Sequence, residues 1–137
     1  MWRRKAQVSM EYLLIVGFAF LMLVPLIIIY YTSQQDLNDK ITISQADRIA
    51  LEIVDTADEV FYQGPPTKKT FKVYMPDDVS AINIQDKYVQ INLKTQPGTP
   101  RYSVANLSGN LSAYGGLHII KVTALDGKVE ITDEDMG

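Results

Sequence analysis

Hydrophobic and polar residues follow three patterns along this chain, and the pattern changes near residues 31 and 67. Residues 12–31 (YLLIVGFAFLMLVPLIIIYY) contain no charged side chain. A helix of about 20 residues rises roughly 30 Å, the thickness of the hydrocarbon core of a bilayer. The stretch therefore predicts one membrane-spanning helix. Tyr30 and Tyr31 lie at its far end, where aromatic side chains favour the membrane interface.

Residues 32–63 keep a helical period but become amphipathic. Apolar residues recur at spacings of three, four and seven or eight, with acidic and basic residues between them. These apolar positions are Leu37, Ile41, Ile49, Ile53, Val54, Ala57, Val60 and Phe61. We expect the helix to continue from the apolar segment, to loosen around Thr42–Ser44 and to end near Tyr62, before Gly64-Pro65-Pro66. The result is one helix of roughly 50 residues, whose outer half packs an apolar stripe on a sheet.

From about residue 67 the period becomes two, which predicts strands. In residues 88–94 (YVQINLK), Val89, Ile91 and Leu93 are expected to face inward. Asp126-Gly127 lies between two apolar runs and is a strong hairpin signal. The predicted strands are Thr70–Met75, Ala81–Ile84, Tyr88–Lys94, Arg101–Ala105, Leu117–Leu125 and Lys128–Thr132. We therefore expect an α+β fold, in which four to six antiparallel strands pack on the outer half of a long N-terminal helix.

The amino-acid composition excludes several kinds of functional site but says little about the fold. The 137 residues include 13 basic and 16 acidic side chains, giving a net charge of −3, with no cysteine and one histidine. The absence of cysteine excludes disulfides, Cys-ligated metals and thiol nucleophiles, and a single histidine excludes multi-His metal sites. The weakly acidic balance offers no electrostatic case for binding nucleic acid.

Few residues in the outer domain have the pattern of a catalytic or metal site. His118 lies in a predicted strand without a companion nucleophile, so we interpret it as a packed or edge residue. Asp77 and Asp78 follow Pro76, as in a turn. The acidic tail, residues 133–137, lacks the ligand spacing of a calcium loop and is expected to be solvated. We expect neither enzymatic activity nor a cofactor.

The residues that precede the apolar segment set the membrane topology. The basic cluster Arg3-Arg4-Lys5 predicts a cytoplasmic N-terminus and an outer C-terminal domain. An ordinary secretory signal has a shorter apolar stretch that ends at small residues, and neither feature is found here. Glu11 is a carboxylate beside an uncharged span, where it either sits at headgroup level or has a dedicated partner.

Arg3-Arg4-Lys5-Ala6, then Gln7-Val8-Ser9-Met10-Glu11-Tyr12 and the apolar helix, resembles the class III signal peptide of archaeal type IV pilin-like proteins. The matching pattern is Q-x-S-x-E-Y. The resemblance implies that a prepilin peptidase cleaves between Ala6 and Gln7. It further implies a removed basic leader (residues 1–6), a transmembrane and filament-core helix (7–31), its amphipathic continuation (32–63) and an extracytoplasmic antiparallel β domain (67–137).

The same resemblance implies partners and a location. The precursor would lie in the lipid bilayer of the plasma membrane, and a membrane platform with its ATPase would assemble trimmed copies into a helical homo-oligomer on the cell surface, with adhesion as the common role. Loss of residues 1–6 would leave 10 basic against 16 acidic residues. No nucleic acid or cofactor is implied.

Three residues of the mature helix are candidates for assembly. Cleavage would create an α-amino group on Gln7, and Glu11 would be the fifth mature residue, able to pair with that amine on an adjacent copy. Gly17 and Pro25 interrupt an otherwise ideal helical sequence. Pro25 is either a tolerated kink or a site where the helix bends during assembly. Gly17 is either a tolerated glycine or a site where another helix approaches closely.

Two N-x-S sequons, beginning at Asn106 and Asn110, lie four residues apart in a predicted outer loop. They are either N-glycosylated or simply part of a polar loop.

A second hypothesis belongs to another class of protein. The chain would be a membrane-anchored extracytoplasmic binding protein that never polymerises, or a minor or motor-associated pilin-like component. Shear would separate these hypotheses, since a major filament subunit is released and an anchored protein stays in the membrane.

Overall fold

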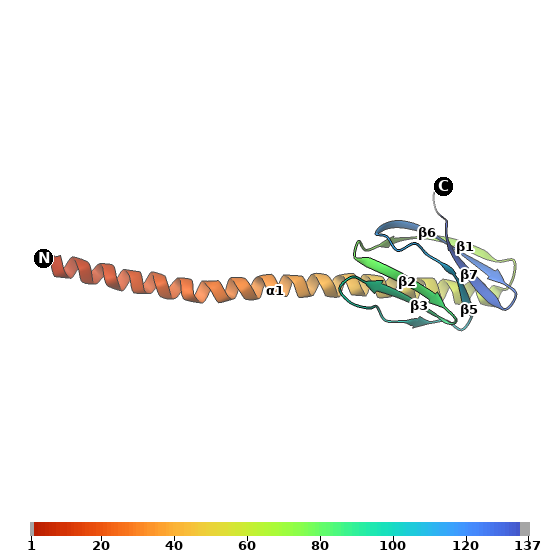
Figure 1. The fold of residues 1–137 in the computed structure, drawn as a ribbon, viewed down its shortest axis with the longest axis horizontal. Coiled ribbons are helices and arrows are strands. Elements are labelled where there is room, and N and C mark those ends of the chain that lie inside the picture. The colour runs from red at the N-terminus through yellow and green to blue at the C-terminus, as the bar shows by residue number, and fades with distance from the viewer. Residues whose placement is uncertain (1, 135–137) are drawn as a thin grey trace. The chain divides into compact units, whose positions relative to one another are not determined.

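The computed structural model describes residues 2–134, and within them a single helix is followed by seven strands, an α+β arrangement (Figure 1). The helix is α1 (Trp2–Gln63). The strands are β1 (Lys68–Met75), β2 (Val79–Gln85), β3 (Tyr88–Leu93), β4 (Arg101–Tyr102), β5 (Asn106–Asn110), β6 (Gly116–Leu125) and β7 (Lys128–Asp133). The chain divides into two compact units, residues 1–38 and residues 39–137.

The first unit is the N-terminal part of α1. It remains helical through Gly17 and Pro25, so neither residue ends the helix. Proline removes one backbone hydrogen bond and crowds the carbonyl four residues earlier, here that of Leu21. The long run of Leu, Ile, Met and Phe on both sides maintains the helix across this local defect.

The helix ends where the sequence predicts. The Gly64 N–H donates to the carbonyl oxygens of Val60 and Phe61 at 3.1 and 3.2 Å. Gly64 has a φ of +76°, a left-handed conformation that glycine adopts without a Cβ penalty, and two prolines follow it. The expected loosening around residues 42–44 is wrong, because α1 is continuous there. Ile43 packs against the core and Ala46 is buried, so the packing of the second unit holds this turn in helical form.

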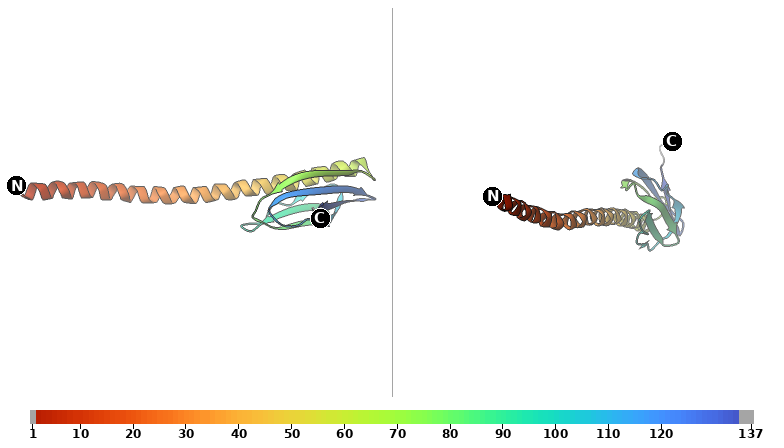
Figure 2. Two further views of the ribbon diagram at one scale, coloured as in Figure 1. Left: turned by 90° about the horizontal axis from the view of Figure 1, so that it is seen from above. Right: turned by 60° about the vertical axis from the view of Figure 1, so that its left-hand side comes forward.

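Seven strands in the second unit form two sheets, with the orders β1-β6-β7-β5 and β2-β3-β4. All pairs are antiparallel except β5 with β7, which is parallel. The expectation of four to six antiparallel strands is therefore wrong in strand number and in this one pairing. The Leu107 N–H donates to the Asp86 carbonyl at 2.5 Å, which joins β5 to the turn after β2. In the left view of Figure 2 the strands lie to one side of the outer part of α1.

Strand β5 is the element that the periodicity missed, since residues 106–110 (NLSGN) were expected to be a loop. Its sequence has no β-branched residue and only one apolar residue. Gly109 has a φ of +137°, and a Cβ placed there would lie 1.8 Å from the Ile131 carbonyl oxygen. Pairing with β7 therefore creates this strand. The predicted strand 101–105 is shortened to Arg101–Tyr102.

The core lies between the outer part of α1 and the inner faces of both sheets. Ile53, Ala57 and Val60 of α1 are fully buried. The strands contribute alternate residues, such as Val89, Ile91 and Leu93 of β3, as predicted. Other buried side chains come from β1, β6 and β7, namely Val73, Met75, Ile120, Val122, Val129 and Ile131. Leu37 and Ile41 were expected in the packed stripe but are 51% and 56% exposed.

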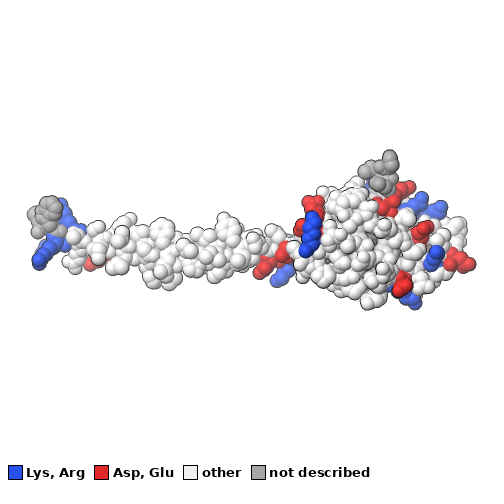
Figure 3. Space-filling view, in the orientation of Figure 1, with Lys and Arg blue, Asp and Glu red and all other residues white. Residues whose placement is uncertain are grey.

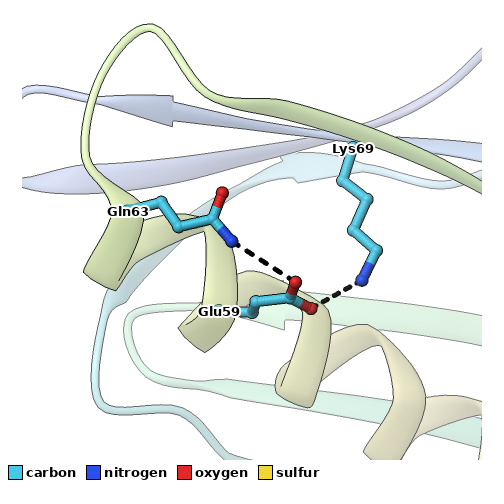
Figure 4. Close-up of polar contacts among 3 residues, drawn as sticks. All are labelled: Glu59, Gln63 and Lys69. Atoms are coloured by element: carbon cyan, nitrogen blue, oxygen red, sulfur yellow. Dashed lines mark hydrogen bonds and ion pairs between the residues drawn. The ribbon is translucent and has the colours of Figure 1, made fainter.

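Polar contacts fasten α1 to the chain that follows it. Glu59 accepts a hydrogen bond from Gln63 at 3.3 Å and pairs with Lys69 of β1 at 2.5 Å (Figure 4). Asp58 accepts hydrogen bonds from the Ser103 hydroxyl and, at 3.0 Å, from the Val104 N–H. The Asp58 carboxylate therefore holds the irregular segment after β4 against the helix, and Glu59 holds the start of β1.

Candidate functional site

The predicted cleavage and recognition residues lie in the first turns of α1. Ala6, Gln7, Ser9, Glu11 and Tyr12 are all helical and exposed. Met1, the first residue of the predicted leader, lies outside the described residues.

Glu11 has no ion-pair partner among residues 2–134. Gln7 lies four residues earlier, about one helical turn away on the same face. An unpaired carboxylate is harmless in water but unfavourable in lipid or inside a helix bundle. If the segment is buried, a cationic group from another molecule is the chemical complement of Glu11.

Nearly every large apolar side chain from Val8 to Tyr31 is exposed in the chain by itself. Leu14 and Ile15 are each 69% exposed, and Ile27 is 49% exposed. Figure 3 shows residues 12–31 of the helix as a surface without charged atoms, between two clusters that carry them. Helix α1 is long and apolar enough to cross a membrane, judged by length and composition. Apolar side chains on all sides of a helix require an apolar surrounding on all sides.

Gly17 and Pro25 lie in this exposed stretch. A Cβ at Gly17 would meet no atom within 4 Å. Gly17 is bordered by Leu13, Leu14, Phe18 and Leu21, which form a shallow apolar hollow on the helix surface. Such a hollow lets another helix approach closely.

The two sequon asparagines, Asn106 and Asn110, begin and end β5 and both are exposed. The expectation of a loop is therefore wrong for this segment, although both side chains reach solvent. The parallel register places Asn106 beside Lys128 and Asn110 beside Thr132 of β7. Ser108 of the first sequon donates its hydroxyl to the Val129 carbonyl at 3.5 Å.

His118 is packed, as predicted, and is completely buried. Its Nδ1 lies 2.7 Å from Asp133 Oδ2 and its Nε2 lies 2.9 Å from the Tyr114 carbonyl oxygen. The Tyr114 ring stacks on the imidazole with 4.0 Å between centroids. Asp133 was expected to be solvated, yet its side chain is only 9% exposed because it is tied to His118. Residues 135–137 of the acidic tail lie outside the described residues.

The turn at Asp77 and Asp78 is confirmed, and Val79 donates to the Pro76 carbonyl at 3.3 Å. Within residues 2–134 no group of three or more His, Cys, Asp or Glu side chains is placed to hold a metal ion.

Three tyrosines are candidates for surface contact. Tyr102 is 71% exposed and Tyr114 is 44% exposed. Tyr88 is half-buried, and the centroid of its ring lies 6.0 Å from that of Tyr102.

A cleft of about 380 Å³ between α1 and the start of β4 was not predicted from the sequence. Its polar lining consists of Lys40, Ser44, Asp47 and Arg48 of α1 and Arg101 of β4. Asp47 Oδ1 accepts from the Thr99 N–H at 3.3 Å, and these residues are 52 positions apart. No local sequence signal relates residues so distant, so only folding identifies this group.

Comparison with family models, curated proteins and solved structures finds no match to this chain.

Proposed function

We propose that this chain is a structural subunit of an archaeal type IV pilus-like surface filament. The precursor is inserted in the plasma membrane, trimmed before Gln7 by a prepilin peptidase and polymerised through its N-terminal helix, with adhesion as the role of the filament. The sequence motif Q-x-S-x-E-Y and the basic residues before it support the processing step.

One observation carries the assembly step. A helix with apolar side chains on every face directly follows the basic leader, and its large side chains are exposed in the isolated chain. Lipid supplies an apolar surrounding before assembly, and the helices of other copies supply one afterwards. The outer domain then forms the solvent-facing layer, which agrees with its own buried core and its charged surface.

Glu11 has a specific part in this proposal. Its carboxylate pairs with the α-amino group that trimming creates on Gln7 of an adjacent copy. The pair removes an otherwise unpaired charge from the filament core, so it favours the correct register more than it adds net stability.

The test expresses the full chain in an archaeal host that supplies a prepilin peptidase, a membrane platform and its ATPase, and measures the mass of the product, then the filament yield in a sheared fraction. We expect a mass beginning at Gln7 and filaments visible by electron microscopy. Glu11→Gln should be trimmed normally but yield far fewer filaments. Glu52→Gln, which removes an exposed acid from the outer part of α1, is the matched control and should assemble like the wild type.

The outcomes separate the hypotheses. Normal assembly of Glu11→Gln would refute the pairing role. A trimmed chain that stays in the membrane under shear would refute polymerisation and favour the anchored binding protein or motor-associated component. A product that keeps residues 1–6 would refute the processing step.

The same proposal includes N-glycosylation at Asn106 and Asn110, which are exposed on an outer strand. Peptide mass spectrometry of the protein from its native cells should find a sugar mass at one or both positions. Unmodified asparagine at both would remove this part.

A further inference from the structure

The cleft between α1 and the start of β4 is lined by more basic than acidic side chains, whereas the chain as a whole is acidic. It combines three basic side chains, from Lys40, Arg48 and Arg101, with one carboxylate, from Asp47. The local balance is therefore positive, although the whole chain carries a net charge of −3. Lys40, Ser44 and Arg48 follow one another at intervals of four residues, which places them along one face of α1.

Two of the three cations have no ion-pair partner in the part of the chain that the structure describes. Within residues 2–134 neither Lys40 nor Arg48 forms an ion pair. Asp47 is already engaged, because Oδ1 accepts from the Thr99 N–H and Oδ2 lies 3.5 Å from Arg101 Nη2. Asp47 thus orients Arg101 rather than neutralising the group.

Arg101 adds an independent observation. Its Nε is a buried side-chain nitrogen without a hydrogen-bond partner among the described residues. A buried donor without an acceptor is unfavourable, but the Arg101 side chain as a whole is 38% exposed, so the terminal nitrogens of the guanidinium, not Nε, are the donors that can reach an anion in the cleft. The second edge of the guanidinium, at Nη2, is held by Asp47 at the longer distance of 3.5 Å.

We propose that this cleft binds a phosphate-type dianion. Inorganic phosphate and phosphate monoesters carry about −1.5 to −2 charges at neutral pH, which matches a surplus of two cations over one carboxylate. Several terminal oxygens accept from ammonium, guanidinium and hydroxyl donors together, whereas a carboxylate offers one charge and two oxygens. The Asp47 carboxylate opposes the anion, so the site discriminates against weakly charged ligands.

Two sources supply this chemistry. Free phosphate is one. The other is a phosphomonoester headgroup at a lipid surface, since Lys40 follows the last residue of the uncharged run, Tyr31, by nine positions in the sequence. The site does not depend on filament formation, and it stands or falls separately from the proposed function.

The experiment titrates inorganic phosphate into the full chain in neutral detergent micelles and follows backbone amide NMR shifts, with chloride added at matched ionic strength as the reference. We expect saturable shifts confined to residues 40–51 and 99–101, with millimolar affinity. Arg48→Gln should weaken binding about tenfold, the effect of losing one charged hydrogen bond. Lys72→Gln, an exposed cation on β1, should leave the affinity unchanged.

Arg101→Gln removes the guanidinium and should also weaken phosphate binding. Arg48→Gln keeps the test decisive if loss of Arg101 disturbs the fold, because Arg48 has no ion pair to lose among the described residues. Shifts that are unsaturable, equal with chloride, or unchanged in Arg48→Gln would overturn the proposal.

A second arm places the chain in nanodiscs that contain either neutral lipids or lipids with phosphomonoester headgroups. The same shifts in the second nanodisc alone, before phosphate is added, assign the lipid source. Shifts that appear only when phosphate is added assign free phosphate. Absence of both overturns the site.

Discussion

Apolar side chains are exposed in the N-terminal half of α1 and buried in its C-terminal, outer half. Ile27 in the apolar half is 49% exposed, whereas Ile53 in the outer half is completely buried. Both are isoleucines in the same uninterrupted α1. The outer half has one apolar stripe, which the β-sheets of its own chain cover. The apolar half is hydrophobic on all sides, so no partner within one compact domain satisfies it.

This contrast separates two kinds of hydrophobic residue. In residues 39–137, apolar side chains stabilise the fold of one molecule. In residues 12–31 they lie exposed in the isolated chain, in a stretch that is long and apolar enough to cross a membrane. Substitutions should therefore act on different observables in the two regions, even where the chemical change is identical.

The largest contrast is expected for isoleucine truncation. Ile53→Ala should lower the free energy of unfolding of the outer domain by about 2–5 kcal/mol, because it leaves a cavity in the core. Ile27→Ala should change the stability of that domain by less than about 0.5 kcal/mol. Amide hydrogen exchange of β6 and β7 in the detergent-solubilised full chain measures both. Equal effects would mean that the two regions do not differ in this way.

Glycine substitution should give effects of opposite sign. Gly109→Ala should cost about 1–3 kcal/mol, because Gly109 has a φ of +137° and a Cβ would meet the Ile131 carbonyl. Gly17→Ala should stabilise the helix by up to about 1 kcal/mol. Thermal unfolding followed by circular dichroism measures the first effect, and helix hydrogen exchange measures the second.

The Gly17 substitution also sharpens the assembly proposal. If Gly17 is a site of close helix approach between copies, Gly17→Ala lowers the filament yield while leaving the outer domain intact. An unchanged yield would contradict a packing role for Gly17.

Breaking the buried pair of His118 and Asp133 should cost about as much as Gly109→Ala and less than Ile53→Ala. Asp133→Asn removes the carboxylate that lies 2.7 Å from the imidazole in a buried site and should cost about 1–3 kcal/mol. Glu134→Gln is the control, because Glu134 is half-exposed and lies 3.9 Å from Lys121, so its loss should cost less than about 0.5 kcal/mol. Urea unfolding of the full chain in micelles compares them. A similar loss of stability for both variants would show that the buried Asp133 carboxylate stabilises the domain no more than the half-exposed Glu134.

The smallest effect belongs to the surface pair of Glu59 and Lys69. Both side chains are nearly half-exposed, so Lys69→Met should change stability by about 1 kcal/mol or less. The difference from the wild type should shrink when salt is added, because ions screen an exposed pair. Melting temperatures at low and high salt test this, and a larger, salt-independent loss would show that Lys69 stabilises through its packed stem instead.

Some elements of the fold can be predicted from local sequence and others cannot. The end of α1 was predictable because Gly64 and the two prolines signal a stop by their own backbone chemistry. Strand β3 was predictable because its alternation reports one buried face. Strand β5 was not, because its residues lack strand propensity and pair only when β7 is beside them. The burial of Asp133 was missed for the same reason, since its partner His118 lies on another strand.

The sequence by itself determined the long helix, its change from uniformly apolar to amphipathic, the hairpin at Asp126-Gly127 and the α+β class, because these features follow from periodicity and backbone preference within a few residues. It also contains the Q-x-S-x-E-Y pattern on which the processing prediction rests, which is a matter of local residue order. Tertiary structure decided the two-sheet arrangement, the parallel pairing of β5 with β7, and the group formed by Lys40, Arg48 and Arg101. These depend on contacts between distant residues, whose free energy no local pattern records.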